Sequence, residues 1–308
     1  MNIKQRSIRV KAPASSGNLG AGFDCVGMAL DWYGEFEFVM DDSPQESQST
    51  DGVSSSIIAS MGERAFAASL AELGITTDTI SVSFRGEIPV GSGLGTSAMA
   101  RAAGITAAAH LAQRPEMRDE LIDIGLALEG HGDNLYPAMY GGIHVVSSDP
   151  LTDALLDLPL SGPRDLEIAL LIPDFTMPTD ESRKLLPERV TVSDAVHNMS
   201  RVGFLIGALY EGRYDLLRHA FDDVLHQPAR SKIFPAMYPL IHAAQSAGAY
   251  GAYLSGGGST IAAVVQKGQS KSVLIALEDC ANEWNLSFTS RVCTIGSEGT
   301  HVVSDTGK

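Results

Sequence analysis

The segment that most constrains the fold is a glycine-rich turn between an extended run and an alanine-rich run. Residues 79–84 (TISVSF) alternate in the manner of a strand, and residues 96–112 read as a helix. The turn between them, residues 89–95, holds one proline and three glycines. Glycine lets a backbone approach a ligand closely, and the first turn of a helix leaves amide groups unpaired with a partial positive charge. The segment therefore predicts a strand–turn–helix unit suited to binding phosphate.

Two common phosphate-binding motifs do not account for this turn. No lysine follows Gly95, so it is not a Walker A loop. No βαβ unit with an acidic residue about 20 positions further on is evident, so it is not a dinucleotide-binding fingerprint. Taken alone, a turn of this composition is equally well explained as the cap of a helix.

Two further glycine-rich segments lie far away in the chain. Residues 13–24 read PASSGNLGAGFD, and residues 253–260 read YLSGGGST. Together with residues 87–100 (EIPVGSGLGTSAMA), and in this order and spacing, they resemble the three motifs of the GHMP small-molecule kinases. The chain has 308 residues, and the resemblance extends from about residue 8 to about residue 265.

Four more segments are similar to the homoserine kinase branch of that family. They are residues 129–138 (EGHGDNLYPA), 182–187 (SRKLLP), 193–201 (SDAVHNMSR) and 226–232 (HQPARSK). Several motif positions differ from the common pattern, such as Thr96 in place of a serine and Gly132 in place of a proline. None of these differences removes a reactive group, so we expect an active enzyme.

The pattern of elements indicates a mixed α+β chain in two halves. Residues 148–164 are rich in turns and contain three prolines, so we place a domain boundary there and predict domains of residues 1–155 and 156–308. The resemblance implies an N-terminal ATP-binding domain like the second domain of ribosomal protein S5 and a ferredoxin-like C-terminal domain. ATP and substrate would meet in the cleft between them.

The remaining elements follow from periodicity. Strands are expected at residues 7–12, 34–40, 141–147, 166–172, 249–254, 260–265 and 287–293. Helices are expected at residues 57–73, 117–128, 193–210, 215–225, 236–247 and 271–284. Residues 41–56 are acidic and serine-rich and are expected to form a surface loop, and residues 13–24 a long turn.

The resemblance implies ATP-dependent phosphorylation of the side-chain hydroxyl of L-homoserine. The phosphates of ATP would lie on the turn and first helical residues, namely Pro89, Val90, Gly91, Ser92, Gly93, Leu94, Gly95, Thr96 and Ser97. Mg²⁺ would be held by Ser97 and Glu129, since it prefers one or two protein oxygens together with phosphate and water oxygens.

The resemblance also implies roles for the substrate-binding side chains. Arg183 and Arg230 suit the substrate carboxylate, which a guanidinium binds through two hydrogen bonds. Asp24, assisted by Asn18, suits the ammonium group. In the residue 129–138 turn, Asn134 would orient the reacting hydroxyl. His131 is a candidate substrate-binding residue that is equally well explained as a structural histidine. We expect the reaction to depend on Asn134, Asp24 and Arg183, with direct in-line transfer and no dedicated base.

Composition excludes several other function classes. There are 22 Lys+Arg against 37 Asp+Glu, a net charge of -15, so nucleic acid and anionic membrane surfaces are not expected partners. Three cysteines without a CxxC pair indicate neither zinc nor a disulfide framework. No apolar run approaches the length of a membrane span, and the start of the chain lacks a signal peptide. We therefore expect a cytoplasmic protein, and the resemblance adds a homodimer.

Two alternative functions remain open at this stage. The first is a GHMP kinase for another small alcohol, such as an isoprenoid precursor or a sugar. The second is a ligand-binding relative that keeps the fold without catalysis. The pair Ser97 and Glu129 argues against the second alternative, because a binding protein has no need of a metal pair.

Overall fold

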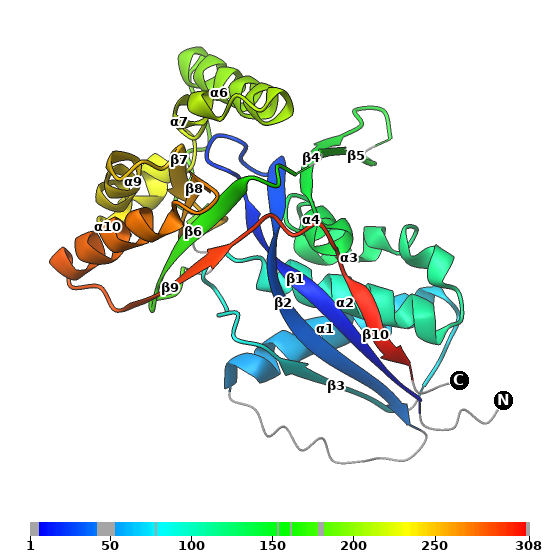
Figure 1. Cartoon of the computed structure of the whole chain (residues 1–308). Helices are drawn as coiled ribbons and strands as arrows, with labels where there is room; N and C mark the ends of the chain where they lie inside the picture. The colour runs from blue at the N-terminus through cyan, green and yellow to red at the C-terminus, as the bar shows by residue number, and fades with distance from the viewer. Residues whose placement is uncertain are drawn as a thin grey trace.

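The computed structural model describes residues 6–41, 53–77, 79–152, 154–160, 162–177 and 182–305, which form two sheets (Figure 1). The first sheet has the strand order β10-β1-β2-β4-β5, with β3 also paired to β2, and all its pairings are antiparallel. Its strands are β1 (Arg6–Gly17), β2 (Val26–Asp41), β3 (Thr79–Arg85), β4 (Ile143–Ser148), β5 (Leu155–Leu160) and β10 (His301–Asp305).

Helices α1 and α2 cover one face of this sheet. The helical segments of this half are α1 (Val53–Glu72), α2 (Thr96–Leu111), η1 (Pro115–Arg118), α3 (Ile122–Glu129) and α4 (Leu135–Tyr140). Helix α2 is almost entirely buried, because its many alanines and its glycine are small enough to let neighbouring elements come close. At the crossing with α1, a Cβ on Gly104 would collide with the carbonyl oxygen of Gly62. The small residues of α2 thus allow the strand–turn–helix unit to sit at the centre of the domain.

The second sheet has the antiparallel order β7-β8-β6-β9. Its elements are β6 (Leu166–Pro173), α9 (Met237–Ser246), β7 (Gly251–Leu254), β8 (Ile261–Gln266), α10 (Ser270–Glu283) and β9 (Phe288–Cys293). The succession β6-α9-β7-β8-α10-β9 with this strand order is the ferredoxin-like arrangement, as expected. Between β6 and α9 the chain inserts α6 (Val192–Glu211), η2 (Tyr214–Leu216), α7 (Leu217–Ala220) and α8 (Gln227–Arg230).

The first glycine-rich segment differs from the expectation of a long turn over residues 13–24. Strand β1 continues to Gly17, and Ser15, Ser16 and Gly17 pair with Ala29, Met28 and Gly27 of β2. The turn is therefore limited to the residues after Gly17. Serine and glycine are poor strand signals, and the pairing partner that stabilises them is visible only in the sheet.

Two expected helices are also shorter in the structure. The helix expected at 117–128 is split into η1 and α3, and the helix expected at 215–225 is reduced to η2 and α7. In the second case the carboxylate of Asp223 accepts hydrogen bonds from the amides of Leu225, His226 and Gln227. These local bonds compete with continuation of the helix.

Four elements were not expected, namely α4, α8, β5 and β10. Of the loop expected at 41–56, residues 53–56 are helical, and residues 42–52 lie outside the described residues. Strand β5 pairs with β4, and β10 returns to pair with β1, so residues 301–305 belong to the first sheet. The division at residue 155 stays a prediction. Among the helices that the structure describes, none has the length and apolar character needed to cross a membrane.

The crossing of α1 and α2 generates a stability prediction. We expect Gly104→Ala to lower the free energy of unfolding by about 1–3 kcal/mol, because the added Cβ collides with Gly62 and lies 2.8 Å from the amide nitrogen of Phe66. Helix propensity alone would raise it by about 1 kcal/mol. Urea unfolding followed by circular dichroism measures the difference. The control Ser60→Ala, on the exposed side of α1, should be neutral or slightly stabilising.

Candidate active site

The three glycine-rich segments meet through backbone hydrogen bonds. The amide of Ser15 donates to the carbonyl of Leu94 at 3.1 Å, and that of Gly256 donates to the carbonyl of Gly17 at 3.1 Å. A third bond joins Thr260 to Ser92 at 3.0 Å. Three segments that lie far apart along the chain thus form one backbone framework.

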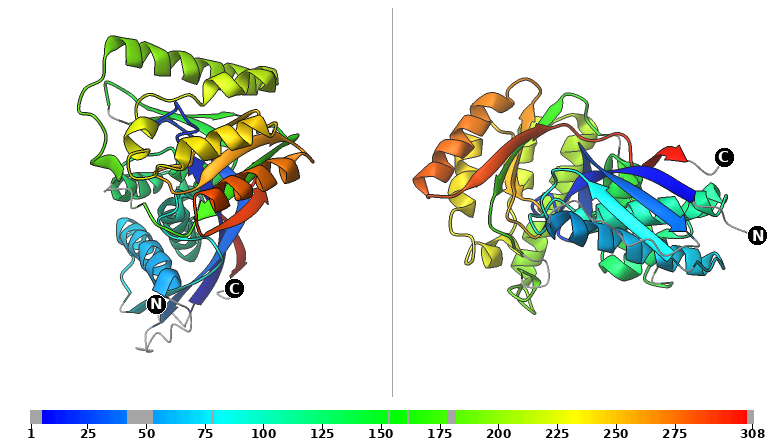
Figure 2. Two further views of the ribbon diagram at one scale, coloured as in Figure 1. Left: turned by 90° about the vertical axis from the view of Figure 1, so that its left-hand side faces the viewer. Right: turned by 90° about the horizontal axis from the view of Figure 1, so that it is seen from below.

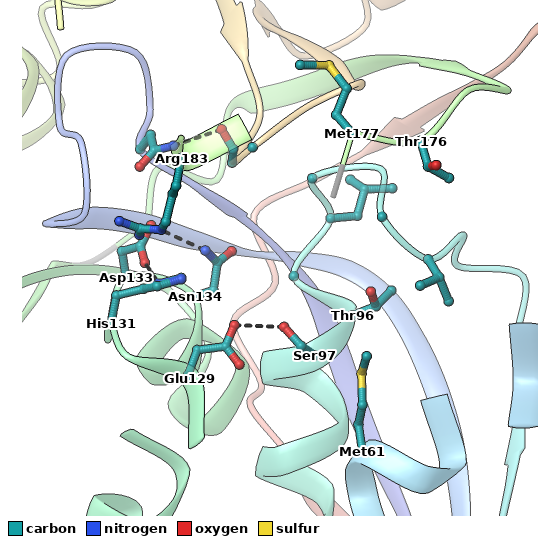
Figure 3. A pocket seen from close by; sticks show the side chains of 18 of the residues that line it. Met61, Thr96, Ser97, Glu129, His131, Asp133, Asn134, Thr176, Met177 and Arg183 are labelled. Atoms are coloured by element: carbon teal, nitrogen blue, oxygen red, sulfur yellow. Dashed lines mark hydrogen bonds and ion pairs between the residues drawn. The ribbon is translucent and has the colours of Figure 1, made fainter. Parts of the chain in front are cut away.

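Glycine is required where the second segment passes the third. Gly93 has a φ of 79°, and a Cβ there would collide with the carbonyl oxygen of Ser255. Gly95 is the N-cap of α2 with a φ of 63°, and no side chain caps this helix end. The first amides of α2 are therefore left to face a cavity of about 430 Å³ (Figure 3).

The predicted phosphate-binding residues divide into two groups. Seven of the nine line the cavity: Val90, Gly91, Gly93, Leu94, Gly95, Thr96 and Ser97. Pro89 and Ser92 are not among its lining residues. The Ser92 hydroxyl donates to the Pro89 carbonyl at 2.9 Å, so these two residues support the turn from behind.

The predicted metal-binding pair is in contact. Ser97 Oγ, in the first turn of α2, donates to Glu129 Oε1 at 2.7 Å (Figure 3). Glu129 ends α3, where Gly130 takes the left-handed conformation that closes the helix. Arg101 forms an ion pair with Glu129, and its burial, with Arg64 nearby, lowers the pKa of Arg101 to about 10. A hydroxyl and a carboxylate beside the anion-binding amides are the oxygen donors that Mg²⁺ takes, so these residues fit the ion.

The turn of the first segment is held in an unusual backbone conformation. Asn18, Leu19 and Asp24 have φ values of 69°, 40° and 59°, which cost non-glycine residues of the order of 1–3 kcal/mol each. The side chain of Asn18 compensates part of this cost. Its amide donates to the Gly256 carbonyl at 2.8 Å, and its oxygen accepts from the Asp24 amide at 3.0 Å. Asn18 therefore holds the turn, and it also lines the cavity.

Arg183 and Arg230 converge on one aromatic ring. Their guanidinium carbons lie 5.5 and 5.6 Å from the centre of the Phe23 ring. Arg183 donates to both oxygens of Asp24, at 2.9 and 2.6 Å, and both side chains are about one-third exposed. An anionic ligand group would find two cations over one ring, one of which is now paired with Asp24.

Arg230 is buried, and His226 holds it. Arg230 donates from one nitrogen to the Gly256 carbonyl at 3.0 Å and to His226 Nδ1 at 2.7 Å. Since Arg only donates, His226 Nδ1 is the acceptor and its Nε2–H donates to the Gly20 carbonyl at 2.8 Å. Burial lowers the pKa of His226 to about 4, which keeps it neutral. Burial and the neighbouring Arg183 lower the pKa of Arg230 to about 10.

The residue 129–138 turn contributes an acidic cluster. His131 Nδ1 donates to Asp133 Oδ1 at 2.5 Å, and Asn134 donates to Asp133 Oδ2 at 3.2 Å. Asn134 also accepts from the Ser15 hydroxyl at 2.9 Å, which links it to β1. Ligand atoms of Asp24, His131 and Asp133 lie within 4.8 Å of one another. This end of the cavity is suited to a small cation such as an ammonium group.

The sequence did not identify the apolar end of the cavity. Ile57 and Met61 of α1 line it together with Val90, Thr176 and Met177. In Figure 3, Thr176 and Met177 lie above the glycine-rich turn and Met61 lies below it, while Arg183, His131 and Asp133 lie to its left. Helical periodicity predicted α1, but no motif marks these side chains, because an apolar pocket needs shape and not particular residues.

All the predicted substrate and metal residues lie around this one cavity. They are Asn18, Asp24, Ser97, Glu129, His131, Asn134, Arg183 and Arg230. They come from both halves of the chain, so the site depends on how the two sheets are joined.

The chain matches two family models. Residues 57–142 match the GHMP kinases N terminal domain, and residues 205–281 match the GHMP kinases C terminal model. Among curated relatives, homoserine kinase of Carboxydothermus hydrogenoformans is 37% identical over 88% of this chain and 88% of its own. Homoserine kinase of Deinococcus radiodurans is 34% identical over 98% of this chain and 99% of its own.

Solved structures agree with this relationship. The homoserine kinase of Cytophaga hutchinsonii superposes with a TM-score of 0.84 at 27% identity, over 96% of this chain and 97% of that one. A mevalonate kinase superposes with a TM-score of 0.67 at 15% identity, over 94% of this chain and 100% of that one, which shows a shared fold only. The sequence and the structure together place this chain in the GHMP kinase family, among the homoserine kinases.

Proposed function

We propose that this protein transfers the γ-phosphoryl group of ATP to the side-chain hydroxyl of L-homoserine, forming O-phospho-L-homoserine. The observation that carries the proposal is the charge arrangement at one end of the cavity. Two arginines meet over Phe23 within reach of two carboxylates, Asp24 and Asp133. An amino acid carries both the carboxylate and the ammonium group that this arrangement complements.

The other end of the cavity supports the nucleotide. The apolar side chains of Ile57, Met61 and Val90 suit an adenine base, and the amides of residues 91–97 would hold the phosphates. Ser97 and Glu129 would hold Mg²⁺, with Arg101 balancing the carboxylate. Bound Mg²⁺ neutralises charge that develops on the transferred group and its leaving oxygen.

The chain's own residues would position the acceptor between these ends. Arg183 and Arg230 would bind the substrate carboxylate. Asp24 would give up its hydrogen bonds with Arg183 and accept hydrogen bonds from the substrate ammonium group. Asn134, whose oxygen accepts from Ser15 and whose amide donates to Asp133, would orient the hydroxyl. Phosphoryl transfer depends mainly on positioning and charge, so we propose direct in-line attack without a dedicated base.

The other kinase substrates complement the site less well. Mevalonate has a carboxylate but no ammonium group for Asp24 and Asp133, and galactose has neither charge. The proposal includes the cytoplasm as compartment, which composition predicts, and a homodimer as assembly, which the resemblance to the family implies.

A coupled ADP-release assay tests the proposed function. We expect turnover with ATP and L-homoserine, little with mevalonate or galactose, and loss of activity when EDTA removes Mg²⁺. Phosphorus NMR would identify O-phospho-L-homoserine as the product. ADP release with another alcohol but not with L-homoserine would favour a GHMP kinase for a different substrate. Ligand binding without ADP release would favour a ligand-binding relative that lacks catalysis.

Asp24→Asn separates an ammonium role from a base role. If Asp24 binds the ammonium group, loss of its charge should raise the KM for homoserine by about tenfold or more and change kcat less. Steady-state kinetics measure both constants. A loss of kcat with unchanged KM would mean that Asp24 acts as a base. The control is Asp215→Asn. Asp215 also accepts two hydrogen bonds from one arginine, Arg213, both at 2.9 Å, but this pair is exposed, so the change should leave both constants unchanged.

The buried neutral His226 predicts an acid-sensitive stability. In the folded protein the His226 ring becomes protonated only near its lowered pKa of about 4. In an unfolded chain it becomes protonated near its ordinary pKa of 6.5. Stability should therefore fall as pH decreases through this window, because protons favour the unfolded state. The slope should be smaller in His226→Asn, measured by urea unfolding at several pH values. The exposed His242→Asn serves as the control and should keep the wild-type slope. An identical slope in His226→Asn would show that His226 is not the group responsible.

A further inference from the structure

Both carboxylate oxygens of Glu129 are already engaged by the chain itself. Oε1 accepts a hydrogen bond from Ser97 Oγ at 2.7 Å, and Oε2 forms an ion pair with Arg101. The side chain of Glu129 is only 7% exposed, and that of Arg101 is 18% exposed. A carboxylate at this depth needs a cationic partner, because burial removes the water that would otherwise solvate its charge. Arg101 supplies that partner from the same helix as Ser97.

Arg101 stands behind the cavity and not in its wall. It follows Ser97 by four residues on α2, so the two side chains lie on one side of this helix. Helices α1, α2 and α3 pack against one another around this region (Figure 2). Ser97 and Glu129 line the cavity, whereas Arg101 is not among the described residues that line it. Arg101 can therefore act on a bound ligand only through Glu129.

The charge of this pair decides how strongly Glu129 attracts a metal ion. A lone carboxylate attracts a divalent cation, but a guanidinium beside it adds a repulsion of nearly the same size. Arg64 of α1 brings a second positive charge close to Arg101. The phosphates of ATP, bound on the amides of residues 91–97, would add several negative charges next to Glu129. Attraction for a divalent cation should thus be weak without nucleotide and strong with it.

We propose that Arg101 is the internal counter-cation of Glu129 and that it confines metal binding at Glu129 to the nucleotide-bound state. The inference rests on the proposed function, because it takes Ser97 and Glu129 as the residues that hold Mg²⁺. Without nucleotide, Arg101 and Ser97 keep the carboxylate in one orientation beside the start of α2. A carboxylate offers about four acceptor positions, so Glu129 can receive a metal ion together with the phosphates without leaving Arg101. Arg101 is thus a positioning residue.

Electron paramagnetic resonance of Mn²⁺ tests the proposal without turnover, because Mn²⁺ takes the same oxygen ligands as Mg²⁺. In the absence of nucleotide we expect Arg101→Met to bind Mn²⁺ about tenfold or more tightly than the wild type, because the repulsion is gone. Arg101→Lys keeps the charge and should bind as weakly as the wild type. The control Arg64→Met removes an exposed charge outside the ion pair and should change the affinity much less.

Urea unfolding without nucleotide tests the ion pair itself. Arg101→Met leaves Glu129 buried without a cation, so the urea midpoint should fall, and adding Glu129→Gln to the same chain should restore most of it. Mn²⁺ should raise the midpoint of Arg101→Met, because the metal ion then neutralises Glu129 in place of Arg101. It should not raise the midpoint of the double variant, which also shows that Mn²⁺ held elsewhere, as by Asp24 and Asp133, is not the cause.

Two results would overturn the proposal. One is an Arg101→Met protein with the wild-type or a lower affinity for Mn²⁺, as expected if Arg101 were merely structural. The other needs no folded variant of Arg101, namely tight binding of Mn²⁺ to the nucleotide-free wild type that Glu129→Gln abolishes. Failure of the proposed function would appear instead as absence of ADP release with L-homoserine, which none of these measurements uses.

Discussion

The site depends on close backbone contact between three glycine-rich segments. Strand β1, the turn before α2 and the turn after β7 are joined by hydrogen bonds such as Ser15 to Leu94 and Gly256 to Gly17. Side chains at positions such as Gly93 would separate them. Because these segments belong to different sheets, the same contact joins the two halves of the chain. The glycines therefore allow the contact that brings ligand-binding residues from both halves around one cavity.

The cavity provides positive groups for anionic ligands although the protein as a whole is negatively charged. An acidic chain can bind phosphate because amides and the start of α2 provide the positive end, without a basic surface. The two arginines at the other end are each constrained. Asp24 holds Arg183, and the neutral His226 holds Arg230 without adding a second positive charge. A protonated His226 would repel Arg230, so burial of the histidine supports the proposed carboxylate site.

Periodic elements could be predicted from the sequence, and elements that depend on a partner could not. Strand β6 and helices α6 and α10 were placed within one or two residues, because each has a long apolar repeat. The sequences of strand β10 and of residues 13–17 only weakly favour a strand. They are strands because β10 pairs with β1 and residues 13–17 pair with β2. The helix expected to reach residue 225 stops early because Asp223 bonds to nearby amides, which periodicity does not reveal.

The sequence by itself determined the kind of chemistry, because motif residues such as Ser97, Glu129, Arg183 and Arg230 are reactive groups whose types and spacing are written in the chain. Only the tertiary structure decided how they combine. It brought residues from distant segments around one cavity, added the apolar end through α1, and paired Arg183 with Asp24 and Arg230 with His226. These relations depend on distances between elements. The packing of the two sheets sets those distances, and a local sequence pattern does not contain them.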